Sequence, residues 1–200
     1  MKKHIVKIIA LGTVAIVCGL ANHSLAQTNA PLASKLLDQA KASGDAQLPV
    51  IATELTGKLQ SFGASLGANP VLKAKVDDVL KNFTGGKDSA ALISALKLAT
   101  AAKFTPEQSG LAKQVGNLAS AYTVQKNFAS LEGSQSDVTT IVSSLRKGEL
   151  TTMVPALQKV GKNAALSPGQ KELFGTLMDN YAPGLRKAAN TLRNVNIPGR

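Results

Sequence analysis

Apolar residues recur along the chain at steps of three and four, which is the spacing of one face of an α-helix. The longest such stripe runs through residues 45–67 and consists of Leu48, Ile51, Leu55, Leu59, Phe62 and Leu66. Gly57 and Gly63 fall inside this stretch and weaken the helix without ending it. The pattern predicts an amphipathic helix whose apolar stripe is buried.

Three further stretches have the same spacing, which predicts three more helices with one apolar face each. Their stripes are Leu72, Val76, Val79 and Phe83; Leu111, Val115, Leu118 and Tyr122; and Leu185, Ala188 and Leu192. The β-branched cluster at residues 138–142 is the one run that favours a strand, yet Val138, Ile141 and Leu145 also fit a helix face. We therefore expect an all-α, single-domain bundle of about seven or eight short helices.

Two similar pentapeptides indicate helix starts. Residues 104–108 read FTPEQ and residues 166–170 read LSPGQ. In each, a Thr or Ser hydroxyl can accept an orphan backbone N–H, and Pro suits the first helical position, where no N–H is needed. The Gln three residues after the cap can bond back to the cap residue. Asn69 followed by Pro70 predicts a third start of this kind, without the Gln.

The same pentapeptides resemble the LTxxQ elements of the Spy-type periplasmic chaperones, which are small, exported and all-helical. The resemblance covers ten residues, and neither copy has both the Leu and the Thr. The Ala-, Gly- and Leu-rich composition also departs from the charged, methionine-bearing chaperones. The resemblance implies a periplasmic chaperone-like protein as an alternative function.

A broader internal similarity links two parts of the chain. The segment VLKNF at residues 79–83 is echoed by VQKNF at 124–128, and each is followed by a helical pattern, at 93–97 and at 142–146. Each unit then runs into one of the two pentapeptides. The order is that of duplicated helix pairs sharing one core, although short matches also arise by chance in a composition of low diversity.

The N-terminal residues have the pattern of a secretory signal peptide. Residues 1–7 carry three lysines, residues 8–20 are uncharged, and Ser24-Leu25-Ala26 forms a small-x-small cleavage site before Gln27. We expect cleavage after Ala26 and a periplasmic or secreted protein. An uncleaved anchor is one alternative, but the run is shorter than the ~20 residues of a membrane span. Lipidation of Cys18 is another, although Val17 occupies the position where a small residue is required.

This division gives a signal peptide at residues 1–26, an all-helical domain at 27–193 and a flexible basic tail at 194–200. Cleavage would remove Cys18, His4 and His23, the only cysteine and histidines of the chain, which also has no Trp. An exported protein without cysteine has no disulfides, so it must be stabilised by its core. A chain of this size buries roughly 70% of its unfolded surface, which is enough for a stable fold without disulfides.

The missing residue types exclude several classes of chemistry. Ser-His-Asp and Cys-His nucleophile systems need an imidazole or thiolate, and zinc and haem sites draw on the same residues. No glycine-rich phosphate loop is present, and TGGKD at 84–88 instead predicts a helix C-cap followed by Asp88 or Ser89 as N-cap. We therefore expect no cofactor and no metal.

Carboxylates are the only remaining acid–base groups near neutral pH, so an enzyme would need a pair of them. The possible members are Glu54, Asp77, Asp78, Glu107, Glu132, Glu149, Glu172 and Asp179. Ordinary structural roles explain several: Asp88 and Glu107 fall in first helical turns, where the dipole favours negative charge, and Asp77 and Asp78 lie among lysines on a solvated face. We expect no enzyme.

Positive charge is concentrated in part of the chain. The formal charge falls from +11 to +8 when the three N-terminal lysines are removed. Residues 27–66 and 105–150 each balance to zero, residues 67–104 carry six lysines against three aspartates, and residues 151–200 carry seven basic groups against two acidic ones. Those seven are Lys159, Lys162, Lys171, Arg186, Lys187, Arg193 and Arg200.

Such an excess is either ordinary solubilising charge or a binding surface for an anionic partner. Anionic lipid, an acidic envelope polymer or an acidic protein surface fits an exported chain. Nucleic acid is not expected, because aromatic stacking groups are few, and no transmembrane helix is expected in the mature chain. The sequence thus predicts an exported, non-catalytic helical protein that binds a ligand or associates with the envelope. The alternatives are the chaperone-like protein and a carboxylate-only hydrolase.

Overall fold

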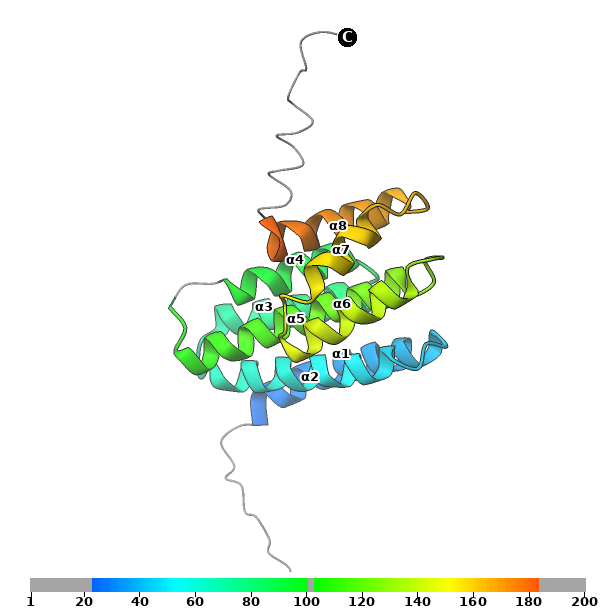
Figure 1. Ribbon diagram of the computed structural model, residues 1–200. Coiled ribbons are helices and arrows are strands. Elements are labelled where there is room, and N and C mark those ends of the chain that lie inside the picture. The colour runs from blue at the N-terminus through cyan, green and yellow to red at the C-terminus, as the bar shows by residue number, and fades with distance from the viewer. Residues whose placement is uncertain (1–22, 101–102, 184–200) are drawn as a thin grey trace, which may run out of the picture.

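Eight α-helices build the part of the chain that the computed structural model describes, which is residues 23–100 and 103–183 (Figure 1). They are α1 (His23–Ala42), α2 (Leu48–Ser65), α3 (Pro70–Thr84), α4 (Asp88–Ala99), α5 (Pro106–Phe128), α6 (Gln135–Lys147), α7 (Met153–Gly161) and α8 (Pro168–Tyr181). These residues contain no β-strand. The predicted all-α class and the predicted number of helices are confirmed, and residues 138–142 lie inside α6.

Helix α5 lies at the centre of the bundle and packs against α2, α4, α6 and α8 (Figure 1). Helices α1 and α2 form one side of the molecule, and α8 lies on the opposite side. Seven consecutive residues of α5, from 118 to 124, are buried, so this helix has no solvated face there. Its predicted stripe is confirmed, but the expectation of a single apolar face was wrong because helices cover α5 from several sides.

The stripes on α2 and α3 are confirmed as core. All six stripe residues are buried, five of them in α2 and Leu66 at its C-cap, and Gly57 and Gly63 lie within the helix as predicted. On α3 the last three residues of the stripe are buried and Leu72 is half-buried. The stripe at Leu185, Ala188 and Leu192 lies outside the described residues.

Both pentapeptides form the predicted capping boxes. Thr105 Oγ1 accepts from the backbone N–H of Gln108 at 3.2 Å, and the Thr105 N–H donates to Gln108 Oε1 at 3.1 Å. Ser167 and Gln170 form the same pair of bonds, at 3.3 and 2.9 Å. Asn69 Oδ1 accepts from the Leu72 N–H at 3.2 Å, which confirms the third start.

The capping glutamines also bind a distant helix, which their sequence pattern did not indicate. Gln108 Nε2 donates to the carbonyl of Ser65, the last residue of α2, at 2.7 Å. Gln170 Nε2 donates to the carbonyl of Asn127, near the end of α5, at 2.5 Å. Each glutamine therefore satisfies an orphan carbonyl at one helix C-terminus while it caps another helix N-terminus.

The chain turns in the same way after α3 and after α6. Gly86 and Gly148 adopt left-handed backbone conformations, with φ of 71° and 75°. The residue after each glycine donates its N–H to the carbonyl four residues before the glycine, at 2.9 Å in both turns. This is the hydrogen bond of a Schellman cap, and glycine permits it because it has no Cβ.

These turns and the capping glutamines all recur at a spacing of 62 residues, which relates α3 to α6 and α5 to α8. The similarity of residues 79–83 to 124–128 follows a different register, because it pairs the end of α3 with the end of α5. The duplication of helix pairs stays a prediction. The hydrogen bonds of the turns and of the capping glutamines favour a repeat of 62 residues over the one suggested by residues 79–83 and 124–128.

The start of α4 differs from the prediction. Gly85 is the C-cap of α3 as expected, but Lys87 and not Asp88 or Ser89 occupies the N-cap position of α4, and no side chain caps it. Asp88 lies in the first turn, where its carboxylate accepts from Lys126 Nζ at 3.0 Å and from Asn127 Nδ2 at 3.2 Å. The Asp88 carboxylate therefore binds α5 and does not cap the N-terminus of α4, which is the role that the local sequence predicted.

Candidate functional site

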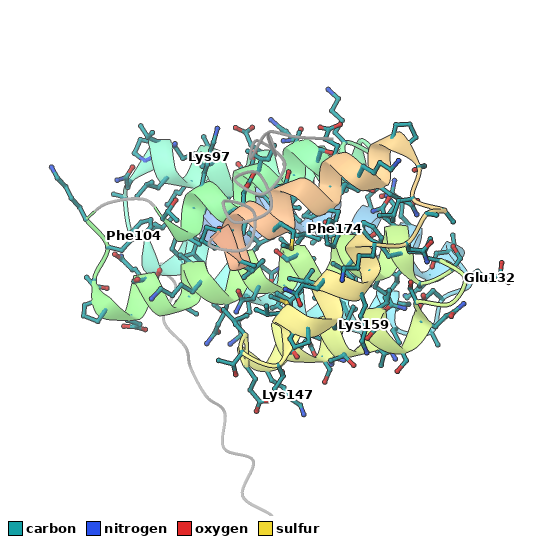
Figure 2. The ribbon with its side chains drawn as sticks, turned by 45° about the horizontal axis from the view of Figure 1, so that its top comes forward. Lys97, Phe104, Glu132, Lys147, Lys159 and Phe174 are labelled. Carbon is teal, nitrogen blue, oxygen red and sulfur yellow. The ribbon has the colours of Figure 1, made fainter. Side chains whose placement is uncertain are left out.

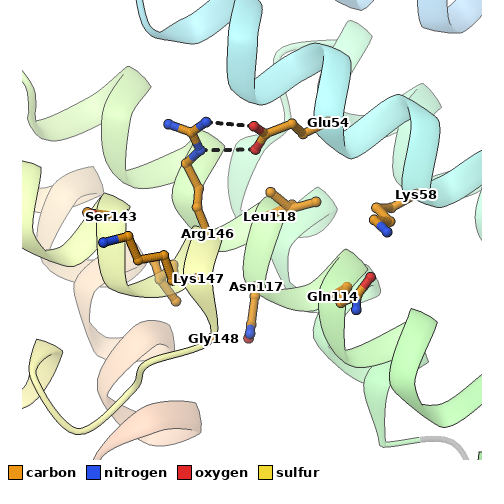
Figure 3. Close-up of a pocket in the computed structure, with 10 residues that line it drawn as sticks. Glu54, Lys58, Gln114, Asn117, Leu118, Ser143, Arg146, Lys147 and Gly148 are labelled. Atoms are coloured by element: carbon orange, nitrogen blue, oxygen red, sulfur yellow. Dashed lines mark hydrogen bonds and ion pairs between the residues drawn. The ribbon is translucent and has the colours of Figure 1, made fainter.

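A cleft of about 600 Å³ opens between α2, α5 and the C-terminal end of α6 (Figure 3). Most of the side chains that line it are polar or charged. They are Glu54 and Lys58 from α2, Gln114, Asn117 and Leu118 from α5, and Ser143, Leu145, Arg146, Lys147 and Gly148 at the end of α6.

Amphipathic patterning places these polar groups at the cleft. Glu54 and Lys58 lie one turn apart on α2, beside the buried stripe that contains Leu55 and Leu59. Asn117 is half-buried next to the buried Leu118 of α5. The apolar side chains hold the helices together, so the polar side chains at their margins form the walls of the cleft.

The cleft is closed along one edge by an ion pair between helices that are far apart in sequence. Arg146 Nε donates to Glu54 Oε2 at 3.0 Å and Arg146 Nη2 to Glu54 Oε1 at 2.6 Å (Figure 3). The hydrogen bond to Glu54 raises the pKa of Arg146. Both side chains are partly exposed, at 31% and 39%, so the pair contributes at most about 1 kcal/mol to stability. It orients the guanidinium and leaves its other N–H groups free to donate.

The remaining charges of the cleft are positive. Lys58 and Lys147 lie on opposite sides of it (Figure 3), and neither forms an ion pair with any described residue. Glu54 is the one carboxylate in the lining, and both of its oxygens accept from Arg146. The C-terminal end of α6 carries the negative end of the helix dipole, and Arg146 and Lys147 oppose it there. The cleft therefore has a surplus of cationic hydrogen-bond donors.

The lining residue Asn117 is held from behind by α8. The hydroxyl of Tyr181, the last residue of α8, lies 3.1 Å from Asn117 Oδ1 and 2.9 Å from Ser120 Oγ. Burial raises the pKa of Tyr181 to about 12. The phenol therefore remains protonated, and able to donate, throughout the neutral range.

The basic residues predicted from the sequence do not line this cleft. Lys159 lies on α7, 71% exposed, and pairs with Asp137 Oδ1 of α6 at 3.4 Å (Figure 2). Lys162 and Lys171 are exposed, at the end of α7 and in the first turn of α8, and form no ion pair with a described residue. Arg186, Lys187, Arg193 and Arg200 lie outside the described residues.

The sequence did not indicate the three cations of the cleft. Lys58 lies in residues 27–66, and Arg146 and Lys147 lie in residues 105–150, and each of these segments has zero net charge. Counting charge along the chain therefore hides them. The one local signal was the Arg146-Lys147-Gly148 sequence, which is typical of a helix C-terminus but does not reveal what it faces.

The carboxylates considered for catalysis are dispersed. Of those eight residues, Glu54 alone lines the cleft. Asp77 is half-buried, and its Oδ1 atom is buried without a hydrogen-bond partner, so the expected solvated face is wrong for that oxygen. Within residues 23–100 and 103–183, no group of three or more His, Cys, Asp or Glu side chains could hold a metal ion. None of the helices described there is both long and apolar enough to span a bilayer.

Comparison with known proteins adds no relative. The chain matches no protein-family model, no curated protein and no solved structure.

Proposed function

We propose that this chain is an exported, non-catalytic binding protein that holds a small ligand with two or more acidic groups in the cleft between α2, α5 and α6. One observation carries the proposal: Lys58 and Lys147 lie on opposite sides of the cleft without carboxylate partners. Two separated cations favour a ligand that carries two separated negative charges.

The size and the donors of the cleft define the ligand further. A volume of about 600 Å³ is within the usual range for a site that takes a small molecule. The lysine ammonium groups, the free N–H groups of Arg146 and the side-chain amides of Gln114 and Asn117 can all donate. Charge-assisted hydrogen bonds to carboxylate or phosphate oxygens are about twice as strong as neutral ones. A compact di- or tricarboxylate or a diphosphate has the required chemistry.

The arrangement of the carboxylates supports binding without catalysis. General acid–base hydrolysis by carboxylates needs two of them flanking the reacting bond. The cleft contains one, Glu54, and Arg146 occupies both of its oxygens. The ion pair orients Arg146.

Export is the second part of the proposal and rests on the N-terminal sequence pattern. The buried residues described in α1, which are Ala33, Leu36 and Ala40, all follow Ala26. Cleavage there would therefore leave these core contacts intact. Intact-mass analysis of the exported protein should give a chain that begins at Gln27, whereas a lipid adduct on Cys18 would contradict this part.

Calorimetric titration tests the binding site. Citrate and pyrophosphate are titrated separately at constant ionic strength, with glycerol as the neutral control, since the two anions distinguish carboxylate from phosphate recognition. Titration is preferable to a melting assay because citrate and phosphate salts stabilise folded proteins through exclusion from their surface. We expect saturable binding of at least one anion and none of glycerol.

A pair of double variants locates the binding. Lys58→Gln/Lys147→Gln should weaken the affinity at least tenfold, because each lost charge-assisted bond contributes about 1.5 kcal/mol or more. Lys162→Gln/Lys171→Gln removes the same charge outside the cleft and should leave the affinity within twofold of the wild type. Equal losses in both variants would mean that net charge and not the cleft attracts the anion.

A further inference from the structure

We infer that Tyr181 is a positioning residue for the cleft: it fixes Asn117 so that the side-chain amide donates toward the ligand, and it thereby makes anion binding depend on the docking of α8. The inference rests on the proposed function and concerns how binding at the same site is regulated. It is carried by hydrogen bonds at the contact between α8 and α5.

The hydroxyl of Tyr181 defines which way the Asn117 amide points. A carboxamide oxygen only accepts hydrogen bonds, so Tyr181 donates to Asn117 Oδ1 across the 3.1 Å contact. The phenol has one proton, which Asn117 accepts, so the Ser120 hydroxyl is the donor across its 2.9 Å contact with the phenol oxygen. The phenol is thus held between two α5 side chains.

The orientation of the amide decides what the cleft offers an anion. Because the Asn117 oxygen is bound by Tyr181, the NH2 group is the end left to face the cleft. It adds a neutral donor between Lys58 and Lys147. The opposite orientation would bring the amide oxygen toward the anion, which is a repulsive contact, and would leave the phenol proton without Asn117 Oδ1 as its acceptor.

Helix α8 packs against α4, α5 and α7, and hydrogen bonds near its two ends fix it to α5. Among its described residues only Leu173 and Leu177 are buried. The start of the helix is bound through Gln170 Nε2 to the Asn127 carbonyl of α5, and its end through Tyr181. Movement of the end of α8 away from α5 would therefore release Asn117 and remove a fixed donor from the cleft.

The variant Tyr181→Phe tests this directly, because it removes one hydroxyl and keeps the ring. We expect its affinity for citrate or pyrophosphate to fall about threefold to tenfold, the loss of one neutral hydrogen bond and of the orientation that it provides. The matched control is Ser120→Ala, which removes the other partner of the phenol but keeps Asn117 bound. Its affinity should stay within twofold of the wild type.

Nuclear magnetic resonance of the Asn117 side-chain NH2 group gives a readout that a general loss of stability would not move. In the wild type and in Ser120→Ala, its two proton signals should shift when the anion is added. In Tyr181→Phe they should differ already without ligand and shift less on titration.

Two results separate this inference from the proposed function. If the wild type binds anions through Lys58 and Lys147 but Tyr181→Phe binds equally well, the inference is overturned and the proposed function stands. If the wild type binds neither anion, the proposed function fails. In that case identical Asn117 NH2 signals in ligand-free wild type and Tyr181→Phe also overturn the positioning role.

Discussion

Gly161, the last residue of α7, lies directly against the ring of Phe174 on α8: a Cβ atom built at position 161 would be 2.5 Å from Phe174 Cε1. No real side chain fits at that distance. Any larger residue at position 161 would therefore have to displace the half-buried Phe174 ring, which Figure 2 shows on α8.

Gly161→Ala should destabilise the protein by about 1–3 kcal/mol, because the new methyl group displaces the Phe174 ring. Chemical denaturation followed by circular dichroism measures the change. The control is Gly57→Ala within α2, where a Cβ meets nothing within 4 Å, so the better helix propensity of alanine should stabilise by about 0.5–1 kcal/mol. A neutral Gly161→Ala would show that the ring moves aside at no cost.

Gln170→Ala should cost more stability than an ordinary surface change. It removes the bond to the Ser167 N–H and leaves the Asn127 carbonyl without its partner, so the loss should be about 1–2 kcal/mol. The neighbouring exposed residue gives the control, since Lys171→Ala should stay within about 0.5 kcal/mol. Thermal unfolding compares the two, and equal values would mean that the contact between α8 and α5 contributes nothing.

Alkaline pH should destabilise the folded protein, because its two tyrosine hydroxyls lose their protons more readily in the unfolded chain. Burial raises the pKa of Tyr122 and of Tyr181 to about 12, with Asp88 adding to the effect on Tyr122. An unfolded tyrosine titrates near pH 10. Between about pH 10 and 12 the unfolded chain thus loses protons that the folded chain retains, so this stabilisation is complete below pH 10 and is lost as the pH rises through 12.

Tyrosinate absorbance and helical circular dichroism, recorded together, check this. The tyrosinate signal should stay low near pH 10 and rise only as the helix signal falls. A tyrosinate signal that is half complete at pH 10 in a folded protein would contradict the burial of the phenols.

Glu54→Gln should strengthen anion binding, which is the opposite of the effect of the lysine variants. It removes the one carboxylate of the cleft and releases Arg146. We expect the affinity for citrate or pyrophosphate to rise about twofold to tenfold. Loss of the exposed ion pair should lower the free energy of unfolding by at most about 1 kcal/mol. Calorimetric titration measures the affinity, and a decrease would mean that the cleft needs Arg146 in its paired orientation.

Attachment to anionic membranes tests the basic C-terminal residues separately from the cleft. Each basic residue near an anionic surface contributes up to ~1 kcal/mol, and the attraction fades within a Debye length of roughly 8 Å at physiological salt. The mature protein should sediment with anionic but not neutral liposomes at low salt and be released by added salt. Changing Arg186, Lys187 and Arg193 to Gln should remove most of this binding, and Lys58→Gln/Lys147→Gln should not. If the triple variant binds as the wild type does, the C-terminal charge is only solubilising.

Local sequence was sufficient to predict most of the secondary structure. The α2 stripe and the capping boxes depend on residues within two turns of each other, and these predictions were confirmed. Asp88 shows where such reasoning stops, because its carboxylate binds Lys126 and Asn127 in place of its own helix terminus. A contact between helices outweighed a local preference there.

The candidate site could not be predicted, because it exists only once α2 and α6 both pack against α5. Glu54 and Arg146 are 92 residues apart, and each lies in a segment without net charge. Tyr181 is one of two tyrosines in the sequence, and its role depends on α8 returning to α5. Spacing within one helix carries no information about such pairings.

The central position of α5 also limits how the polypeptide can be divided. Although the turns after α3 and α6 recur at one spacing, α5 supplies core residues to the helices before it and to those after it. A chain cut in the loop at residues 129–134 would leave α6, α7 and α8 without the surface on which they rest, and would expose the same surface on the other fragment. The two halves are therefore a single cooperative folding unit and not a pair of separable modules.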